Sequence, residues 1–249
     1  MMTFKKCFPK ATSLIGMIHL KALPGTPAYG GNITEIIELA LKEAEIYQSA
    51  GLDGIIIENM HDLPYLNRSV GHEISTLMAI IGYEIKKMTR MPCGIQILAG
   101  ANEAALAAAK AGGLDFIRAE GFVFAHVADE GLIQSDAGNL LRYRKQIDAE
   151  NILIFTDIKK KHSAPSLTAD VDLLETARAA EFFKSDGLIV TGTATGQPAD
   201  FEAVKQVKEN CNLPVMVGSG ITAENARAFA KVSDALIIGS WFKQGGHWA

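Results

Sequence analysis

The sequence contains little cysteine and no long apolar run. Only three of its 249 residues are cysteines, Cys7, Cys93 and Cys211, and no two of them form a Cys-x-x-Cys pair. Such widely separated cysteines are typical of reduced thiols in an intracellular protein, and they argue against a disulfide framework or a zinc site. No apolar stretch reaches the roughly 20 residues of a transmembrane helix. Residues 1–10 contain three lysines but lack the apolar core of a secretory signal. We therefore expect a soluble, cytoplasmic protein, and residues 1–10 leave organelle targeting open.

The sequence also lacks an excess of charge of either sign. Its 24 lysines and arginines and 28 acidic residues give a net charge of -4, which argues against broad binding to nucleic acid or to anionic membranes. Hydrophobic residues make up 48% of the chain, enough for a sizeable core. Because no linker or shift in composition is visible, we expect residues 1–249 to form a single domain. That length is typical of a parallel α/β barrel, which takes about 250 residues.

Eight apolar runs alternate with helical patterns along the chain. A continuous β-branched run such as Ile55–Ile57 predicts a strand buried on both faces, as in a parallel sheet. The order of elements predicts a (β/α)8 TIM barrel with eight parallel strands. Only ten residues follow Gly239, so we expect the last helix to be short or missing. The expected strands are 14–19, 53–58, 94–98, 115–120, 152–157, 187–191, 215–218 and 235–239, and the expected helices are 34–50, 70–90, 102–111, 136–149, 170–184, 198–209 and 222–231.

A short motif recurs where a helix ends and the next strand begins. It contains an aspartate that follows a glycine-leucine pair or a serine, at Asp53, Asp115, Asp186 and Asp234. A glycine C-cap or a short aspartate turn suits a tight connection from helix to strand. Repeats of this kind support the barrel.

The connections on the other side of the predicted barrel are much longer. The loops after strands one, two, four and five each run to about ten residues or more, and in TIM barrels these loops build the active site. Polar residues gather at the same strand ends. They are His19, Glu58, Gln96, Arg118, Glu120, Asp157 and Thr191.

Arg118 and Glu120 are two residues apart, so they share one face of their strand with Phe116. Ile117 and Ala119 face the other way. A charged pair inside a barrel is costly unless it is matched, and Glu58 and Asp157 are natural partners for Arg118. Two interpretations are open. Arg118 neutralises these acids, or the network holds one carboxylate as a general base and shifts its pKa.

Glycine-rich turns end the last strands. Gly218-Ser219-Gly220 precedes a helix capped by Thr222, and Gly239-Ser240 ends the eighth strand. Backbone N–H groups in such turns bind anions, and a phosphate site after strands seven and eight recurs in barrel enzymes. We expect a phosphate to contact the residues of these two turns and Gly192 in the neighbouring loop 191–196. The residues of the turns are Gly218, Ser219, Gly220, Gly239 and Ser240.

Two long loops carry further candidates. The loop 121–135 contains Phe122, Phe124 and His126, which could form a lid or pack over the barrel mouth. The run Lys159–His162 follows strand five, and one of its lysines could bind a second anionic group or act as a Schiff-base nucleophile. His19, Glu58 and Asp157 could ligate a divalent metal, but no spacing identifies one, so we predict no cofactor.

Several motifs together resemble the BtpA/SgcQ family. They are residues 17–27 (MIHLKALPGTP), 51–59 with Asp62 and Pro64, 157–162 (DIKKKH), 191–196 with Pro198, and 218–222 (GSGIT), within a similarity that runs over residues 14–249. The resemblance implies a TIM-type barrel related to phosphate-binding barrels and brings no settled reaction. The family is named for a role in photosystem I biogenesis in cyanobacteria and for a member encoded with sugar-uptake genes.

On the matching motifs, the resemblance implies a pocket made by His19, Glu58, Asn59, Asp157, Lys161, His162 and the Thr/Gly loops. The loop at 121–126 departs from the polar His-Thr-Gly-like pattern that is usual in the family. Family members usually continue past the Gly-Gly-x-Trp sequence, here residues 245–248, into a last helix.

The leading hypothesis is an enzyme that acts on a small phosphorylated metabolite, a sugar or nucleoside phosphate. Glu58 or Asp157 would be one proton carrier and His19 or His162 the other, in an isomerase, lyase or hydrolase. The alternative is a non-catalytic assembly or biogenesis factor that binds a protein partner. We expect a homo-oligomer in either case. The expected substrate contacts are Asn59, Gln96, Arg118, Glu120, Lys161, Thr191 and Thr193.

Overall fold

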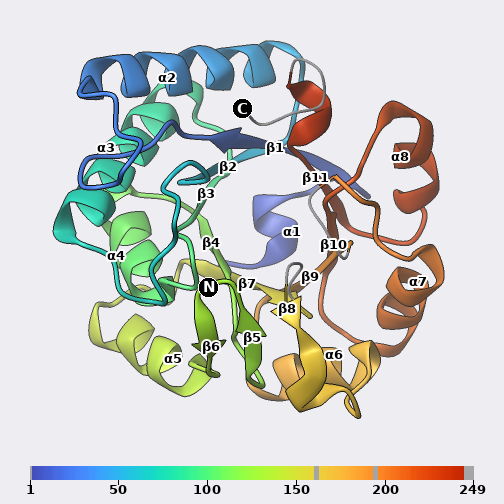
Figure 1. Cartoon of the computed structure of the whole chain (residues 1–249). Coiled ribbons are helices and arrows are strands. Elements are labelled where there is room, and N and C mark those ends of the chain that lie inside the picture. The colour runs from blue at the N-terminus through green and yellow to red at the C-terminus, as the bar shows by residue number, and fades with distance from the viewer. Residues whose placement is uncertain (1, 160–162, 193–195, 244–249) are drawn as a thin grey trace.

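The structure is a computed structural model that describes residues 2–159, 163–192 and 196–243. Eight parallel strands close into a barrel in the order β1-β11-β10-β9-β7-β4-β3-β2, which confirms the predicted (β/α)8 fold (Figure 1). The strands are β1 Ser13–His19, β2 Gly54–Glu58, β3 Cys93–Gln96, β4 Phe116–Ala119, β7 Leu153–Ile158, β9 Gly187–Thr191, β10 Val215–Gly218 and β11 Ala235–Ile238.

Helices surround the strands on the outside of the barrel (Figure 1). After β11, the described residues form the 3-10 turn η2, Ser240–Phe242, rather than an α-helix. None of the helices in the described part of the chain is both long and apolar enough to span a membrane. The outer helices are α2 Ile33–Ser49, α3 His72–Thr89, α4 Asn102–Gly112, α5 Ala137–Gln146, α6 Leu173–Phe182, α7 Phe201–Asn210 and α8 Ala223–Phe229, and a second 3-10 turn, η1, spans Pro165–Thr168.

The core has two layers that explain the continuous apolar runs. Inside the barrel, Ile56 packs with Phe116, Phe155 and other inward side chains. The alternate residues of the same strands, such as Ile55 and Ile57, face the helices. Phe116 thus shares the inner face with Arg118, while Ile117 and Ala119 belong to the outer layer, as the period of two predicts.

The N-terminal end of the barrel is closed by a short helix that the sequence analysis missed. Helix α1, Phe4–Cys7, is capped by Thr3 and lies across the opening of the ring in Figure 1. The Phe4 ring centroid lies 5.8 Å from that of Phe155. Phe8, which follows the helix, lies 5.7 Å from Phe116. Four residues are too few to show a helical period, so the sequence pattern contains no signal for this element.

The repeated aspartates form one structure four times, which we call the aspartate clasp. Each carboxylate accepts a hydrogen bond from the backbone N–H at the start of a neighbouring strand, and each aspartate N–H donates back to the same residue. A basic side chain pairs with each carboxylate. The clasps are Asp53 with Leu14 and Lys10, Asp115 with Cys93 and Lys86, Asp186 with Ile154 and Arg144, and Asp234 with Val215 and Lys208, with N–H to carboxylate distances of 2.8–2.9 Å.

Two long loops at the other end of the barrel are joined by a small sheet. The loop after β4 forms the hairpin of β5, His126–Ala128, and β6, Gly131–Ile133. Strand β5 also pairs antiparallel with β8, Ser163–Ala164, from the loop after β7. In the loop after β4, Phe122 is buried and Phe124 is 36% exposed. The two loops therefore form one structural unit at the mouth of the barrel.

Arg68, in the loop between β2 and α3, fixes the base of that hairpin. Its guanidinium lies 2.6 Å from the Asp136 carboxylate and donates to the carbonyls of Gly100 and Gly121 at 3.0 and 2.9 Å. One side chain thus joins the loops after β2, β3 and β4. Polar contacts therefore tie three loops together at the end of the barrel where a site is expected.

We expect Asp115→Ala to lower the free energy of unfolding by about 2–3 kcal/mol, because it leaves the buried Cys93 N–H without an acceptor and removes the Lys86 ion pair. Asp115→Asn keeps a neutral acceptor and should cost about 1 kcal/mol. Urea denaturation measures both values. Asp129→Ala, at an exposed position, is the control. Equal stabilities of the Asp115→Ala and Asp129→Ala variants would contradict the structural role of the clasp.

Candidate active site

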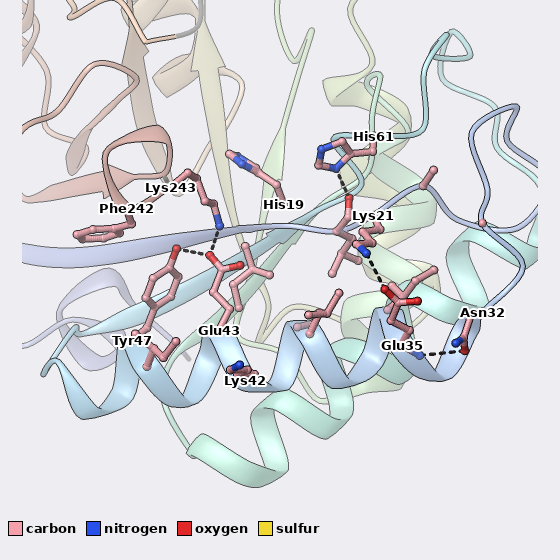
Figure 2. Close-up of a pocket in the computed structure, with 18 of the residues that line it drawn as sticks. His19, Lys21, Asn32, Glu35, Lys42, Glu43, Tyr47, His61, Phe242 and Lys243 are labelled. Atoms are coloured by element: carbon pink, nitrogen blue, oxygen red, sulfur yellow. Dashed lines mark hydrogen bonds and ion pairs between the residues drawn. The ribbon is translucent and has the colours of Figure 1, made fainter. Parts of the chain in front are cut away.

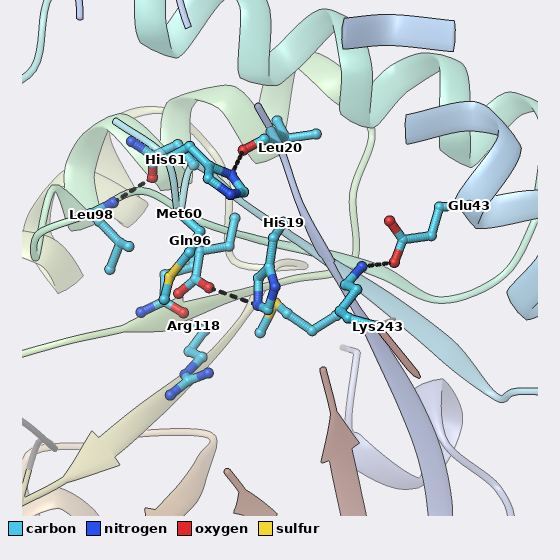
Figure 3. A network of polar contacts seen from close by, with 12 residues as sticks. His19, Leu20, Glu43, Met60, His61, Gln96, Leu98, Arg118 and Lys243 are labelled. Atoms are coloured by element: carbon cyan, nitrogen blue, oxygen red, sulfur yellow. Dashed lines mark hydrogen bonds and ion pairs between the residues drawn. The ribbon is translucent and has the colours of Figure 1, made fainter. Parts of the chain in front are cut away.

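His19 and Glu58 stand at the ends of adjacent strands and face one another. They are register partners in the pairing of β1 with β2, and His19 Nε2 lies 3.4 Å from Glu58 Oε2. Figure 3 shows this contact as the dashed line that reaches the His19 ring. A Cβ atom at Gly239 would lie 3.1 Å from His19 Cε1, so a glycine there lets the end of β11 approach the ring. Two side chains that can carry protons thus lie side by side at the mouth of the barrel.

Arg118 forms a buried, two-point ion pair with Asp157. Arg118 Nε lies 2.8 Å from Asp157 Oδ2 and Nη2 lies 2.9 Å from Oδ1, and both side chains are at most 5% exposed. Of the two acids expected to match Arg118, Asp157 is the one in contact, whereas Glu58 faces His19. Burial alone would lower the pKa of the Arg118 guanidinium, but the charge and hydrogen bonds of Asp157 and the nearby charges of Glu58 and Glu120 raise that pKa above its ordinary value.

Gln96 and Glu120 form the next part of this polar layer. Gln96 Nε2 donates to Glu120 Oε1 at 3.2 Å, and the Asn102 side chain bonds to both the N–H and the carbonyl of Glu120. Gln96 Oε1 and Thr191 Oγ1 are buried, and neither has a hydrogen-bond partner among the described residues. Buried polar atoms usually have a partner, so these two are exceptions among the described residues. Sequence analysis missed Asn102, because it is the first residue of α4 and lies outside any strand end.

Asn59, which the family resemblance assigns to the pocket, bonds to two neighbouring loops. Its Oδ1 accepts from the Leu98 N–H and its Nδ2 donates to Asp62 Oδ2, both at 2.8 Å. Asp62 in turn accepts from the Leu23 N–H at 2.8 Å. The Asn59 amide therefore ties together the loops after β1, β2 and β3.

A cavity of about 190 Å³ opens beside these side chains, and we call it the strand-end cavity. It is bounded by His19, Glu58 and Arg118 on one side and by the glycine-rich turns on the other. Of the residues predicted to bind phosphate, Gly192 and Gly218 do not line it. The rest of its lining is Met17, Met60, Gly196, Ser219, Gly220, Ile221, Thr222, Ile237, Gly239, Ser240 and Trp241.

The turn after β10 presents its backbone to this cavity. Ser219 and Gly220 both have left-handed backbone conformations, with φ of 66° and 61°. A Cβ atom at Gly220 would lie 2.2 Å from Pro198 N, so no side chain fits there. Among the hydrogen bonds between described residues, none has the N–H of Ser219, Gly220 or Ile221 as its donor, and the same holds for Ser240 and Trp241. Within the described ranges these five N–H groups have no hydrogen-bond acceptor, and all five residues line the cavity.

Three predicted site residues, Lys161, His162 and Thr193, lie outside the described residues. Within the described ranges, no three histidine, cysteine or acidic side chains gather closely enough to hold a metal ion. His19 and Glu58 are together, but Asp157 is turned to Arg118. The sequence analysis also missed Trp241 and the two methionines of the cavity, since apolar residues near strand ends carry no distinguishing pattern.

A larger groove of about 940 Å³ runs along α2 on the outside of the barrel (Figure 2). Leu39 and Ile46 line it and are 42% and 56% exposed. At one end Lys243 pairs with Glu43, which also contacts the Tyr47 hydroxyl, and the rings of Phe242 and Tyr47 are 5.4 Å apart. These contacts hold η2 against α2. Of the predicted catalytic residues that the structure describes, the groove includes only His19.

The closed barrel, with a cavity at the carboxyl ends of its strands, defines a TIM-barrel protein. The chain belongs to the BtpA family, whose family model matches residues 10–249. This finding confirms the resemblance seen in the sequence motifs.

Two relatives show how far the similarity extends. An uncharacterised mitochondrial protein of Caenorhabditis elegans, F13E9.13, is 51% identical over 240 residues, which cover 94% of this chain and 86% of that protein. The photosystem I biogenesis protein BtpA of Synechocystis is 32% identical, with 96% of this chain and 83% of that protein covered. The similarity therefore extends over nearly the whole chain.

Solved structures with the same fold are more distant in sequence. The N-acetylmannosamine-6-phosphate 2-epimerase of Clostridium perfringens is 15% identical with a TM-score of 0.59, covering 94% of this chain and 88% of that one. Orotidine 5'-monophosphate decarboxylase of Methanocaldococcus jannaschii is also 15% identical, with a TM-score of 0.54 and coverages of 94% and 93%. At this level of identity the likeness shows the barrel fold alone.

We expect Arg118→Met and Asp157→Asn each to destabilise the protein, Arg118→Met by about 3–5 kcal/mol because it leaves a buried carboxylate unpaired. The double variant should cost less than the sum of the two single variants. Urea denaturation of the wild type, the two single variants and the double variant gives the coupling energy between the two side chains. Additive costs would show that the two charges do not interact, contrary to the geometry of the pair.

Proposed function

We propose that this protein is an enzyme that acts on a small phosphorylated metabolite by acid–base chemistry in the strand-end cavity. The observation that carries the proposal is that His19, Glu58 and Arg118 line the same cavity as the two glycine-rich turns. A substrate bound there would have its phosphate on backbone donors and its reacting atoms beside a proton-carrying pair.

The backbone of the turns supports phosphate binding. The N–H groups of Ser219, Gly220 and Ile221 belong to consecutive residues, and all three residues line the cavity. Successive backbone donors of this kind make a concave site for an anion. Both enzymes described above are named for phosphorylated compounds, which agrees with a phosphate site in a barrel of this kind.

The ion pairs favour Glu58 over Asp157 as the proton carrier. Both oxygens of Asp157 accept from Arg118, so its carboxylate is held in that pair. Glu58 faces the cavity with His19 as its neighbour. We assign proton transfer to Glu58 and His19, and we assign to Asp157 the positioning of Arg118.

The size of the cavity favours a substrate with few carbon atoms. Its volume of about 190 Å³ is below the 300–1,000 Å³ that is typical of sites for drug-sized ligands. A small sugar phosphate therefore suits the cavity better than a nucleoside phosphate does.

A second candidate function is that of an assembly factor that binds a protein partner. The name of the Synechocystis relative describes such a role for that protein. The observation that favours it here is the apolar groove along α2 (Figure 2), which offers exposed leucine and isoleucine side chains to a partner. This role needs neither a phosphate site nor a proton carrier.

We expect glycerol 3-phosphate and inorganic phosphate to raise the melting temperature of the wild-type protein. At a hundredfold excess over the dissociation constant the stabilisation is about 2.7 kcal/mol, or about 5–10 °C for a chain of this size. Ser219→Asp should abolish the shift, because its carboxylate repels the phosphate. Differential scanning fluorimetry measures both proteins.

Ser219→Asn is the matched control. Asparagine and aspartate have nearly the same shape, and both tolerate the left-handed conformation at residue 219. The asparagine variant should keep most of the ligand-induced shift. Equal shifts in the wild type and Ser219→Asp, or no shift in the wild type, would contradict the proposed phosphate site and leave the assembly role as the better account.

A further inference from the structure

Arg118 has a donor edge that none of the described residues uses. Its Nε and Nη2 atoms are engaged by Asp157 at 2.8 and 2.9 Å. A guanidinium paired through these two nitrogens directs its remaining edge, with Nη1, away from the carboxylate. Among the described residues, no hydrogen bond or ion pair involves Nη1, and Arg118 lines the strand-end cavity. Figure 3 shows Arg118 and His19 at this end of the barrel. Nη1 is therefore positioned to bind an acceptor in the cavity.

The charges around Arg118 limit which acceptor suits it. Glu58 and Glu120 both act on the guanidinium through space. A second carboxylate or phosphate brought to this side of the cavity would be repelled by these acids. A neutral carbonyl oxygen is not repelled in the ground state, and Arg118 would stabilise the negative charge that it gains during a reaction.

The other reacting groups lie around the same space. Glu58 lines the cavity with Arg118, and His19 is 3.4 Å from Glu58. The glycine-rich turns, where the phosphate is proposed to bind, form the opposite side. A phosphorylated carbonyl compound would thus place its carbonyl oxygen by Arg118 and its neighbouring carbon by Glu58.

We infer that the reaction is the transfer of a proton at the carbon next to the carbonyl group of a small sugar phosphate, which Arg118 holds by its carbonyl oxygen. The inference rests on the proposed phosphate site. It selects isomerisation or epimerisation from the isomerase, lyase and hydrolase reactions that the sequence leaves open.

The step balances without a co-reactant. The Glu58 carboxylate takes the proton from the carbon, the C–H electron pair becomes a C=C bond, and the carbonyl π pair moves to the oxygen, where Arg118 donates to it. Delivery of a proton from water to the other face of the same carbon, with loss of the first proton from Glu58 to solvent, gives an epimer. Return of the proton to the former carbonyl carbon gives an isomer, with His19 carrying the hydroxyl proton from one oxygen to the other.

Hydrogen exchange with solvent tests the inference. Dihydroxyacetone phosphate, glyceraldehyde 3-phosphate, ribulose 5-phosphate and ribose 5-phosphate are each incubated with the wild-type protein in D2O. Proton NMR follows the signal of the carbon next to the carbonyl, with buffer alone as the blank. We expect at least one compound to lose this signal through exchange. Glu58→Gln should slow the exchange at least about 100-fold, the contribution typical of a positioned general base.

Arg118→Lys tests the carbonyl contact separately. The lysine keeps a positive charge beside Asp157, but its single ammonium group cannot reproduce the arginine fork. We expect exchange to fall at least about tenfold, while the melting-temperature shift with glycerol 3-phosphate is retained. That shift also shows that each variant is folded. Glu38→Gln, at an exposed position on α2, is the matched control and should exchange as the wild type does.

The outcomes separate the two proposals. If glycerol 3-phosphate stabilises the wild type but none of the four compounds exchanges, the proton-transfer inference is overturned and the phosphate site stands. If glycerol 3-phosphate and inorganic phosphate give no stabilisation, the proposed function fails as well. Exchange at the wild-type rate in both Glu58→Gln and Arg118→Lys would overturn the roles assigned to these residues.

Discussion

The aspartate clasps hold the strands of this barrel in register at its N-terminal end. Each joins two strands through a backbone N–H to carboxylate bond and a returning backbone bond, and each carboxylate also has a basic partner. Because Asp53, Asp115, Asp186 and Asp234 are occupied in this way, the acids at that end are committed to structure. Of the acids at the other end, Asp157 is held by Arg118, whereas Glu58 lines the strand-end cavity.

The register set at one end determines which side chains meet at the other. His19 stands opposite Glu58 and Glu58 stands opposite Gln96, so three polar residues follow one another around the rim. Arg118 lies on β4 and contacts Asp157 on the adjacent strand β7. This ion pair holds the guanidinium in one orientation through Nε and Nη2. The same contact leaves Nη1 for the carbonyl oxygen of the proposed substrate.

Much of the fold could be predicted from the sequence, because each strand is an apolar run and the loops are long at one end only. Side chains alternate between the two faces of a strand, so the sequence predicted that Phe116 and Arg118 share one face of theirs. The partner of Arg118 could not be chosen between Glu58 and Asp157, since strand order and side-chain reach decide it. Helix α1 and the small sheet of β5, β6 and β8 were missed. Each of these elements has only two to four residues, too few to show a helical or strand pattern in the sequence. The role of Asn59 as a bridge between loops depends on contacts with Leu98 and Asp62 that no motif shows.

The central claim is that backbone amides at the ends of β10 and β11 bind a phosphate group. A titration of the 15N-labelled protein with inorganic phosphate, followed by amide NMR, tests this claim most directly. The account predicts that the amide signals of Ser219, Gly220, Ile221, Ser240 and Trp241 move together along one binding curve, while those of Asp53 and Asp115 at the opposite end stay in place. Shifts that are absent from these five amides, or that are equally large at the clasps, would contradict it.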